Sequence, residues 1–199
     1  MLISIFVGGC TTSNPEAPSS GSASSTGGNA ALCSCVEAAP GAAPALACTT
    51  DDHTDCGLFR HAVASSGGSG GPDVPPEGCE FDDQGDVDCE SANLDVVACA
   101  VAAQQAQEPF VARSLEVPSA PAAREVTLFA DATSVLEIRI SWDDLTGSWP
   151  AVHARVLPEL AACADPVDAA TGWQCILDAV RDAESLAECV EAGSVTTYD

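Results

Sequence analysis

Two short segments of the chain carry the residue types that hold metal ions. The first is CTTDDHTDC, residues 48–56, which offers thiol, imidazole and carboxylate groups, and His61 follows soon after it. Zinc and copper use such ligands, but the spacing matches no standard zinc finger. In an oxidising compartment the thiolates that a metal needs are consumed as disulfides, so we expect an acidic loop closed by disulfides here rather than a metal centre.

The second segment is EFDDQGDVDCE, residues 80–90, in which carboxylates alternate along the chain. Its pattern resembles the calcium loop of an EF-hand weakly, because Val87 stands where that loop needs a glycine for its sharp turn. Two interpretations stay open. One is a weak calcium site formed by Asp82, Asp86 and Asp88; the other, which we favour, is a solvated acidic loop closed by a disulfide. The sequence indicates no other cofactor.

Catalysis needs a positioned general base, and the histidines available for that role are His53, His61 and His153. His153 alternates with apolar neighbours, which places it on the exposed face of a predicted strand. Abundant carboxylates carry no information in so acidic a chain. We therefore expect a protein that is not an enzyme, and a secreted hydrolase or redox enzyme is the alternative.

The charge balance of the chain excludes one class of partner. Thirty acidic residues face six arginines and no lysine, which gives a formal net charge of −24 over 199 residues. Recognition of DNA, RNA or anionic lipid headgroups begins with neutralised phosphates, so such a chain repels them. We expect no nucleic-acid partner, and the sequence does not distinguish a protein partner from a glycan.

The number of cysteines points to an oxidising compartment. Eleven cysteines are too many for a reducing cytosol unless they bind metal or perform redox chemistry, and the CxxC spacing of such sites is absent. Setting Cys10 apart leaves an even number, as a disulfide framework requires. The ten candidates for this framework are Cys33, Cys35, Cys48, Cys56, Cys79, Cys89, Cys99, Cys163, Cys175 and Cys189.

Spacing along the chain suggests some of the pairings. Cys79 and Cys89 can close the acidic loop between them, and the four earlier cysteines, from Cys33 to Cys56, can close among themselves. Three cysteines then remain near the C-terminus, so at least one of them must cross back to an earlier element. We expect Cys99 to be its partner, although other connectivities are open.

Cys10 itself stands in the segment VGGC, residues 7–10, directly after a short apolar run. This segment resembles the lipobox of bacterial lipoproteins, in which the cysteine receives diacylglycerol and becomes the new N-terminus. The resemblance implies lipidation of Cys10 and attachment to the cell envelope. Thr11 rather than Asp after the cysteine implies the outer membrane, with the protein facing the periplasm or the exterior. Because no basic residues precede the apolar run, we expect the true start codon upstream of Met1.

Composition divides the chain into five regions. They are a truncated signal segment (1–9), the lipidated cysteine with a Ser/Gly/Pro-rich disordered tether (10–31), a Cys-rich segment (32–64), a second low-complexity linker (65–78), and a small domain (79–199). The Cys-rich segment has few large apolar residues, so it must be cross-linked or docked to be ordered. No stretch beyond the signal segment approaches the length of a membrane span.

Hydrophobic periodicity within the small domain predicts an α+β fold. A helix is expected over 93–107 with Asn93 as its N-cap, followed by strands over 110–117, 125–130, 135–142 and 152–157. Short links between the strands favour a four-stranded antiparallel meander without long crossovers. After Pro158 we expect C-terminal helices, one with the stripe Trp173, Ile176, Leu177 and Val180, and a last helical piece around 184–190.

Together these features predict a secreted, lipid-anchored, disulfide-stapled protein of the bacterial cell envelope with a binding or structural role. The tryptophans Trp142, Trp149 and Trp173 are assigned to packing in the core or at its rim rather than to a ligand platform. A calcium-binding surface module is a further alternative.

Overall fold

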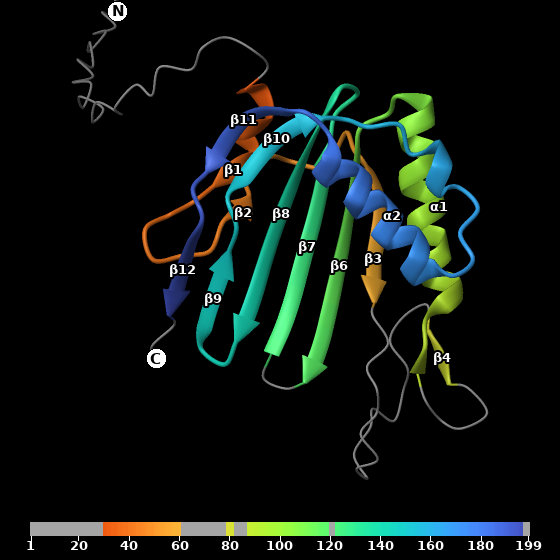
Figure 1. The fold of residues 1–199 in the computed structure, drawn as a ribbon, viewed down its shortest axis with the longest axis horizontal. Coiled ribbons are helices and arrows are strands. Elements are labelled where there is room, and N and C mark those ends of the chain that lie inside the picture. Colours follow the sequence, from red (N-terminus) through yellow and green to blue (C-terminus); the bar gives the residue numbers. More distant parts are fainter. Residues whose placement is uncertain (1–29, 61–78, 82–86, 120–121, 197–199) are drawn as a thin grey trace, which may run out of the picture.

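The computed structural model of the chain describes residues 30–60, 79–81, 87–119 and 122–196. These residues form twelve strands, two α-helices and two short 3-10 helices, η1 (Ala30–Cys35) and η2 (Ala161–Cys163). Figure 1 shows a large twisted sheet with one α-helix beside one edge, the other α-helix crossing in front of the sheet, and residues 30–48 near the opposite edge. No helix among the described residues has the length and the apolar character that a membrane crossing requires.

The large sheet contains eight strands, of which six lie in the order β11-β10-β8-β7-β6-β3. Their bounds are β3 Thr54–Arg60, β6 Phe110–Ser119, β7 Ala122–Ala130, β8 Ser134–Asp143, β10 Val152–Val156 and β11 Ser185–Val190. The strand β9 (Thr146–Trp149) pairs with the C-terminal end of β8, and β9 in turn pairs with β12 (Gly193–Thr196). Two hairpins, β1 (Val36–Glu37) with β2 (Ala45–Leu46) and β4 (Glu80–Phe81) with β5 (Val87–Asp88), lie outside this sheet.

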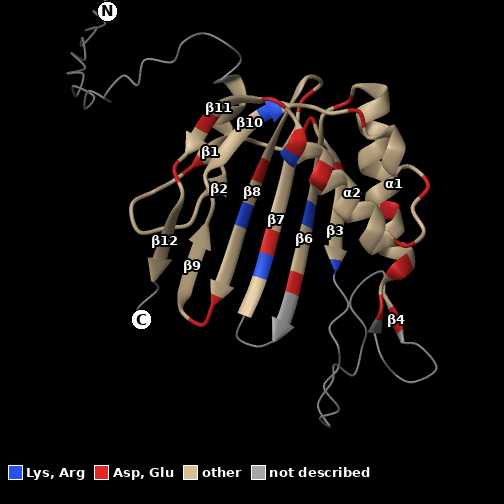
Figure 2. Ribbon diagram, in the orientation of Figure 1, with Lys and Arg blue, Asp and Glu red and all other residues tan. Residues whose placement is uncertain are grey.

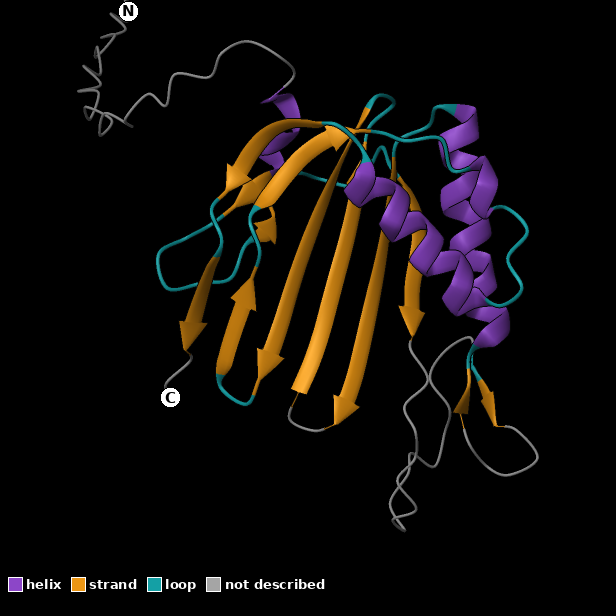
Figure 3. Cartoon of the chain, viewed as in Figure 1, coloured by secondary structure: helices purple, strands orange, loops and turns teal. Residues whose placement is uncertain are grey.

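The predicted fold class, a helix followed by a four-stranded antiparallel meander and C-terminal helices, is wrong. The predicted strands exist, and β6, β7 and β8 do pair antiparallel, but the sheet is larger and mixed. The predicted link after Trp142 contains a tight turn, in which Asp144 has a φ of 54° and the chain returns as β9. Figure 3 shows that strands dominate the architecture.

The parallel strand in the sheet is β3, which comes from the Cys-rich segment. It pairs with β6, and the helix α1 (Glu90–Ala106) lies in the connection between the two strands. Parallel neighbours need such a crossover, which the prediction had excluded. The alternation that marks a strand is interrupted here because a register shift falls at Gly57, where φ is 90°.

The C-terminal segment around 184–190 is a strand and not the predicted helix. Its residues are good helix formers, but β11 completes the edge of the sheet by pairing antiparallel with β10. Cys189 of β11 is also bonded to Cys33 of η1. Pairing and cross-linking outweigh the local preference, as tertiary context commonly does.

The helices cover one face of the sheet, which we call the helix face. α2 (Ala169–Asp182) begins at Asp168, whose carboxylate accepts a hydrogen bond from the Thr171 amide, and this bond lowers the pKa of the Asp168 carboxyl. The predicted stripe of α2 is confirmed, since all four of its side chains are buried in one core with α1 and the sheet: Trp173, Ile176, Leu177 and Val180.

We had expected Asn93 to be the N-cap of the first helix, and this prediction is wrong. α1 begins at Glu90, and Asn93 lies buried in its first turn. The Arg60 amide donates to Asn93 Oδ1 at 2.8 Å, and Asn93 Nδ2 donates to the Arg60 carbonyl at 2.6 Å. The Asn93 side chain therefore supplies the backbone hydrogen bonds that a neighbouring strand would give to Arg60, the last residue of β3. An apolar side chain could not form these bonds.

A second apolar core lies on the opposite face, which we call the clip face. There η1 and the β1–β2 hairpin, residues 30–48, form an N-terminal clip over the upper part of the sheet. Beneath the clip lie the fully buried side chains of Val111, Phe129 and Leu136. The Cys-rich segment is therefore ordered by docking, as its composition requires.

Asp131 organises the turn between β7 and β8. Its Oδ1 accepts hydrogen bonds from the amides of Thr133 and Ser134 at 2.7 and 2.6 Å, and from both hydroxyls. Partial burial alone would raise the pKa of the Asp131 carboxyl, but these donors outweigh burial and hold the pKa below its ordinary value.

Asp131→Asn is expected to lower the free energy of unfolding at neutral pH by about 1–3 kcal/mol, the contribution typical of hydrogen bonds to a charged group. A carboxyl whose pKa is depressed on folding stabilises the protein above its unfolded pKa of about 3.9, and this stabilisation is lost as the pH falls through the folded value. Urea unfolding should show that the difference in the free energy of unfolding between the variant and the wild type becomes smaller below about pH 4. Asp143→Asn, an exposed strand position, is the control. A gap that widens on acidification would contradict this account.

Candidate functional site

All ten cysteines of the described residues are paired. The bonds are Cys33–Cys189, Cys35–Cys48, Cys56–Cys99, Cys79–Cys89 and Cys163–Cys175. Cys79–Cys89 is the pair that the spacing predicted. Disulfides of this number indicate an oxidising compartment, so the folded part of the chain is extracytoplasmic.

Two expectations about the connectivity are wrong. Cys99 bonds to Cys56 and not to a C-terminal cysteine, and of the four early cysteines only Cys35 and Cys48 bond to each other. The bond that crosses back from the C-terminus joins Cys189 to Cys33 over 156 positions. Sequence spacing could not reveal this, because Cys189 was placed in a helix, whereas β11 brings it beside η1 on the clip face.

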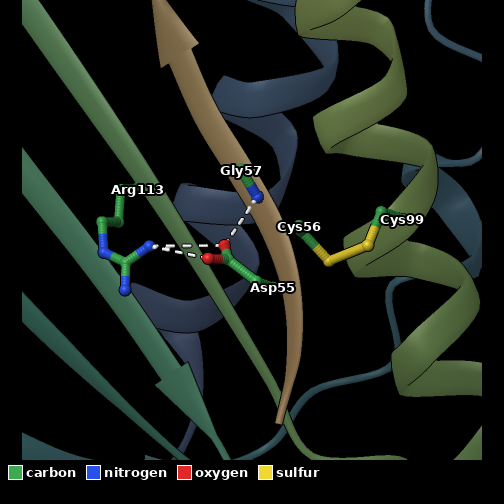
Figure 4. The surroundings of a disulfide bond; sticks show 5 residues. All are labelled: Asp55, Cys56, Gly57, Cys99 and Arg113. Carbon is green, nitrogen blue, oxygen red and sulfur yellow. Dashed lines mark hydrogen bonds and ion pairs between the residues drawn. A yellow bond between two sulfur atoms is a disulfide. The ribbon is translucent and has the colours of Figure 1, made fainter. Parts of the chain in front are cut away.

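The Cys56–Cys99 bond ties the bulge of β3 to the middle of α1 (Figure 4). Beside it, Asp55 Oδ1 accepts from the Gly57 amide at 2.9 Å and lies 3.3 Å from Arg113 Nη1 of β6. Asp55 and Arg113 are both substantially exposed, so this ion pair contributes little stability. Among the described residues next to the disulfide, the polar groups of Asp55, Gly57 and Arg113 make structural contacts, and none of them is positioned for catalysis.

The first metal-like segment is used for folding. Cys48 and Cys56 belong to different disulfides, and His53 stacks on Phe129 with its ring centroid 4.4 Å away. Over the described ranges, no three His, Cys, Asp or Glu side chains come together as a metal site. His61 lies outside the described residues.

The second segment is described only at its ends. Asp82 and Asp86 of the calcium hypothesis lie outside the described residues. Asp88 lies in β5, and its Oδ1 accepts from the Glu90 amide at 2.8 Å, beside the start of α1. Glu90 in turn accepts from the Ala169 amide at 2.7 Å, at the start of α2. These two carboxylates satisfy free amides at helix starts.

His153 lies beside a serine hydroxyl, which is the arrangement of a nucleophile and a base. It lies on the helix face of β10, and its Nδ1 is 3.2 Å from the Ser185 hydroxyl of β11. A serine nucleophile with a histidine base needs a third group that orients the ring and donors that stabilise an oxyanion. Among the described residues no carboxylate hydrogen bonds to His153, and the Ser185 hydroxyl is exposed on the surface. Within the described part of the chain, the pair is therefore without a carboxylate that would orient the His153 ring.

The arginines do not form a basic patch. Figure 2 shows them distributed over the strands and among acidic residues. Arg113, Arg124, Arg139 and Arg181 each form an ion pair with Asp or Glu, and Arg155 donates to the Ala183 carbonyl at 3.0 Å. The sixth arginine, Arg60 at the end of β3, is half-buried, so the described part of the chain presents no cluster of cations for a polyanion to bind.

An aromatic surface lies on the clip face, in the part that the clip leaves open. It consists of Ile140, Trp142, Trp149 and Val195, which come from β8, β9 and β12 and are all half-buried. We call it the tryptophan shelf. The register places these side chains on one face, since Trp142 pairs with Gly147, and Gly147 pairs with Val195.

Both indoles of the shelf lie flat over glycines. A Cβ placed on Gly147 would be 2.6 Å from Trp142 Cζ3 and 2.9 Å from each neighbouring ring atom, so it would sit over the ring face and not beyond its edge. The same test on Gly193 puts the Cβ 2.8 to 3.2 Å from three atoms of Trp149. Trp149 Nε1 also donates to the Glu191 carbonyl at 3.2 Å.

The predicted packing in the core is confirmed for Trp173, whose side chain is buried. Trp142 and Trp149 pack at the rim, half-buried, each opposite a glycine, since a cross-strand glycine gives a large ring a flat seat on the sheet. This arrangement becomes visible only once the strand pairing is known.

The tryptophan shelf is thus a half-buried aromatic surface whose two indoles are seated on glycines. Comparison of the chain with protein-family models, with curated proteins and with solved structures finds no match in any of the three.

Proposed function

We propose that the protein is a lipid-anchored, non-catalytic binding module of the bacterial cell envelope, attached to the outer membrane through Cys10. The observation that carries the proposal is the number of cysteines that remain outside the disulfides. Of the eleven cysteines in the chain, ten are joined in the five disulfides, and the one left over is the cysteine of the lipobox-like VGGC segment. An odd cysteine in an oxidising compartment needs its own chemistry, and thioether attachment of a lipid supplies it.

The distribution of sequence types fits such an anchor. Residues 11–29 between Cys10 and η1 are rich in Ser, Gly and Pro, a composition typical of linkers, and a Ser/Gly-rich linker of this length would span about 25 Å. Such a tether would hold the folded part clear of the bilayer surface. The negative net charge would keep it from lying down on anionic headgroups.

The shelf supports a binding role, and around His153 the described residues do not form a catalytic triad. One acyl chain gives weak attachment, whereas the diacylglycerol and amide-linked acyl groups of a processed lipoprotein give stable attachment. The protein would thus present its aromatic surface to envelope components within reach of the tether.

Metabolic labelling with an alkyne analogue of palmitate tests the anchor. In the native host the wild-type protein is expected to incorporate the label and to partition into detergent, whereas Cys10→Ala is expected to lose the label and to appear in the aqueous phase. The matched control is Cys79→Ser with Cys89→Ser, which removes cysteines elsewhere and should label as the wild type does. Equal labelling of Cys10→Ala would rule the anchor out.

A further inference from the structure

We propose that the tryptophan shelf binds an uncharged pyranose glycan. The inference deepens the proposed binding role and rests on it, but it does not depend on the lipid anchor. A pyranose ring has an apolar face of C–H groups and a rim of hydroxyls, so a protein holds it by stacking an aromatic ring on the face and placing polar groups at the rim. The shelf offers both.

The first step is that the two indoles are fixed in advance. Each has one face against the backbone of a neighbouring strand, over Gly147 or Gly193, so the opposite face points away from the sheet. The hydrogen bond from Trp149 Nε1 to the Glu191 carbonyl fixes the rotation of that ring. Rigid aromatic rings contribute contact area at little cost in conformational entropy, so a ligand meets a preformed surface.

The second step is that the rings are close enough to act on one chain of sugars. Ser141 of β8 pairs with Ser148 of β9, and this register makes Trp142 and Trp149 diagonal neighbours on the clip face. Diagonal neighbours in an antiparallel pair lie about 7–8 Å apart. Two flat faces at this separation, with the apolar side chains of Ile140 and Val195 beside them, can take adjacent rings of a linear glycan.

The third step is the polar rim. Glu125 of β7 pairs with Ile140 and is the diagonal neighbour of Trp142, on the same face of the sheet. Its carboxylate is exposed and forms no ion pair with any other described residue. A carboxylate beside an aromatic face is a strong acceptor for sugar hydroxyls.

Charge then selects among glycans. The net charge of −24 and the carboxylate at the shelf repel sulfated, phosphorylated and uronic acid polymers, and among the described residues five of the six arginines are engaged in ion pairs or in a hydrogen bond to a carbonyl, with Arg60 as the exception. A neutral pyranose chain remains the partner that the surface fits. If the rings served a protein partner instead, the oligosaccharides of the experiment below would not bind.

Titration calorimetry of the full chain with chitohexaose and with cellohexaose tests the proposal. Wild type is expected to bind at least one of them, and Trp142→Ala and Trp149→Ala are each expected to weaken binding by about 10-fold or more. Glu125→Gln, which keeps the shape of the side chain, is expected to weaken binding less. Ser148→Ala, on the opposite face of β9, is the control and should bind as the wild type does.

Two further variants protect the test against misfolding. Trp142→Phe keeps an aromatic ring over Gly147 and should retain part of the affinity, whereas Gly147→Val leaves both tryptophans present but displaces the Trp142 ring, and should weaken binding as Trp142→Ala does. Failure of the wild type to bind either oligosaccharide, binding unchanged by the shelf variants, or tighter binding of alginate than of the neutral sugars would each overturn the proposal. If the bound glycan were shortened during the titration, the shelf would stand and the non-catalytic role would fail.

Discussion

Trp173→Ala is expected to destabilise the folded chain by about 3–5 kcal/mol, the loss typical of truncating a buried large aromatic side chain. Trp173 is buried to 1% exposure in α2 and stacks on Phe59 of β3, with the ring centroids 5.4 Å apart. This contact joins the helix to the parallel edge strand across the core. Its removal therefore loosens both elements.

Trp173→Phe is expected to cost far less, within about 1.5 kcal/mol. The indole Nε1 of Trp173 is buried and has no hydrogen-bond partner among the described residues, and an unsatisfied buried donor costs about 1–3 kcal/mol. Phenylalanine loses part of the packing but also removes this unpaired donor. Denaturant unfolding followed by circular dichroism measures both variants, with Val167→Ala at a site exposed to 95% as the control. A loss below 1 kcal/mol for the alanine variant would contradict the placement of Trp173 in the core.

Removing the bond between Cys33 and Cys189 is the second large effect that we expect. With serine at both positions the free energy of unfolding should fall by about 4–5 kcal/mol, because the bond closes a loop of 156 positions and longer loops restrict the unfolded chain more. The matched control is the Cys163–Cys175 bond, with a separation of 12 and an expected loss of about 3 kcal/mol.

The two bonds also differ in which part of the protein they hold. Cys33–Cys189 ties the N-terminal clip to β11, so its loss should raise hydrogen exchange in residues 30–48 and expose the core beneath them. The control variant should leave the clip protected. The expectation would be contradicted if removing Cys33–Cys189 lowered the free energy of unfolding less than removing Cys163–Cys175 and left hydrogen exchange in the clip unchanged. The clip would then dock without its disulfide.

Much of the central sheet could be predicted from alternation alone. In β7 the side chains of Val126, Leu128 and Ala130 share the helix face, as the period of two predicted, and the stripe of α2 was equally clear. These segments pack one face against a continuous core, so their sequences carry the pattern directly.

The missed strands carry no such pattern, for particular reasons. In β3 the bulge at Gly57 breaks the alternation, and β9 is too short to show one. In β11 the residues favour a helix, and only the pairing with β10 and the bond from Cys189 overrule them. The flat orientation of Trp142 and Trp149 could not be predicted for a similar reason, since the glycines beneath them are defined by the pairing of β8, β9 and β12.

The parity of the cysteines was predictable and their connectivity was not. An even number apart from Cys10 follows from counting, whereas the partner of each cysteine depends on which strands are neighbours. Cys99 illustrates this, because its position on α1 was placed correctly and its partner on β3 could not be named without the parallel strand.

Mass spectrometry of the protein extracted from its own membranes, digested without reduction, tests the central claim most directly. The account predicts five disulfide-linked peptide pairs with the connectivity of the structure, Cys33 to Cys189 among them, and an N-terminal peptide that begins at Cys10 and carries a diacylglyceryl thioether. A Cys10 peptide found in a disulfide, with one of the other ten cysteines left as a free thiol, would contradict it.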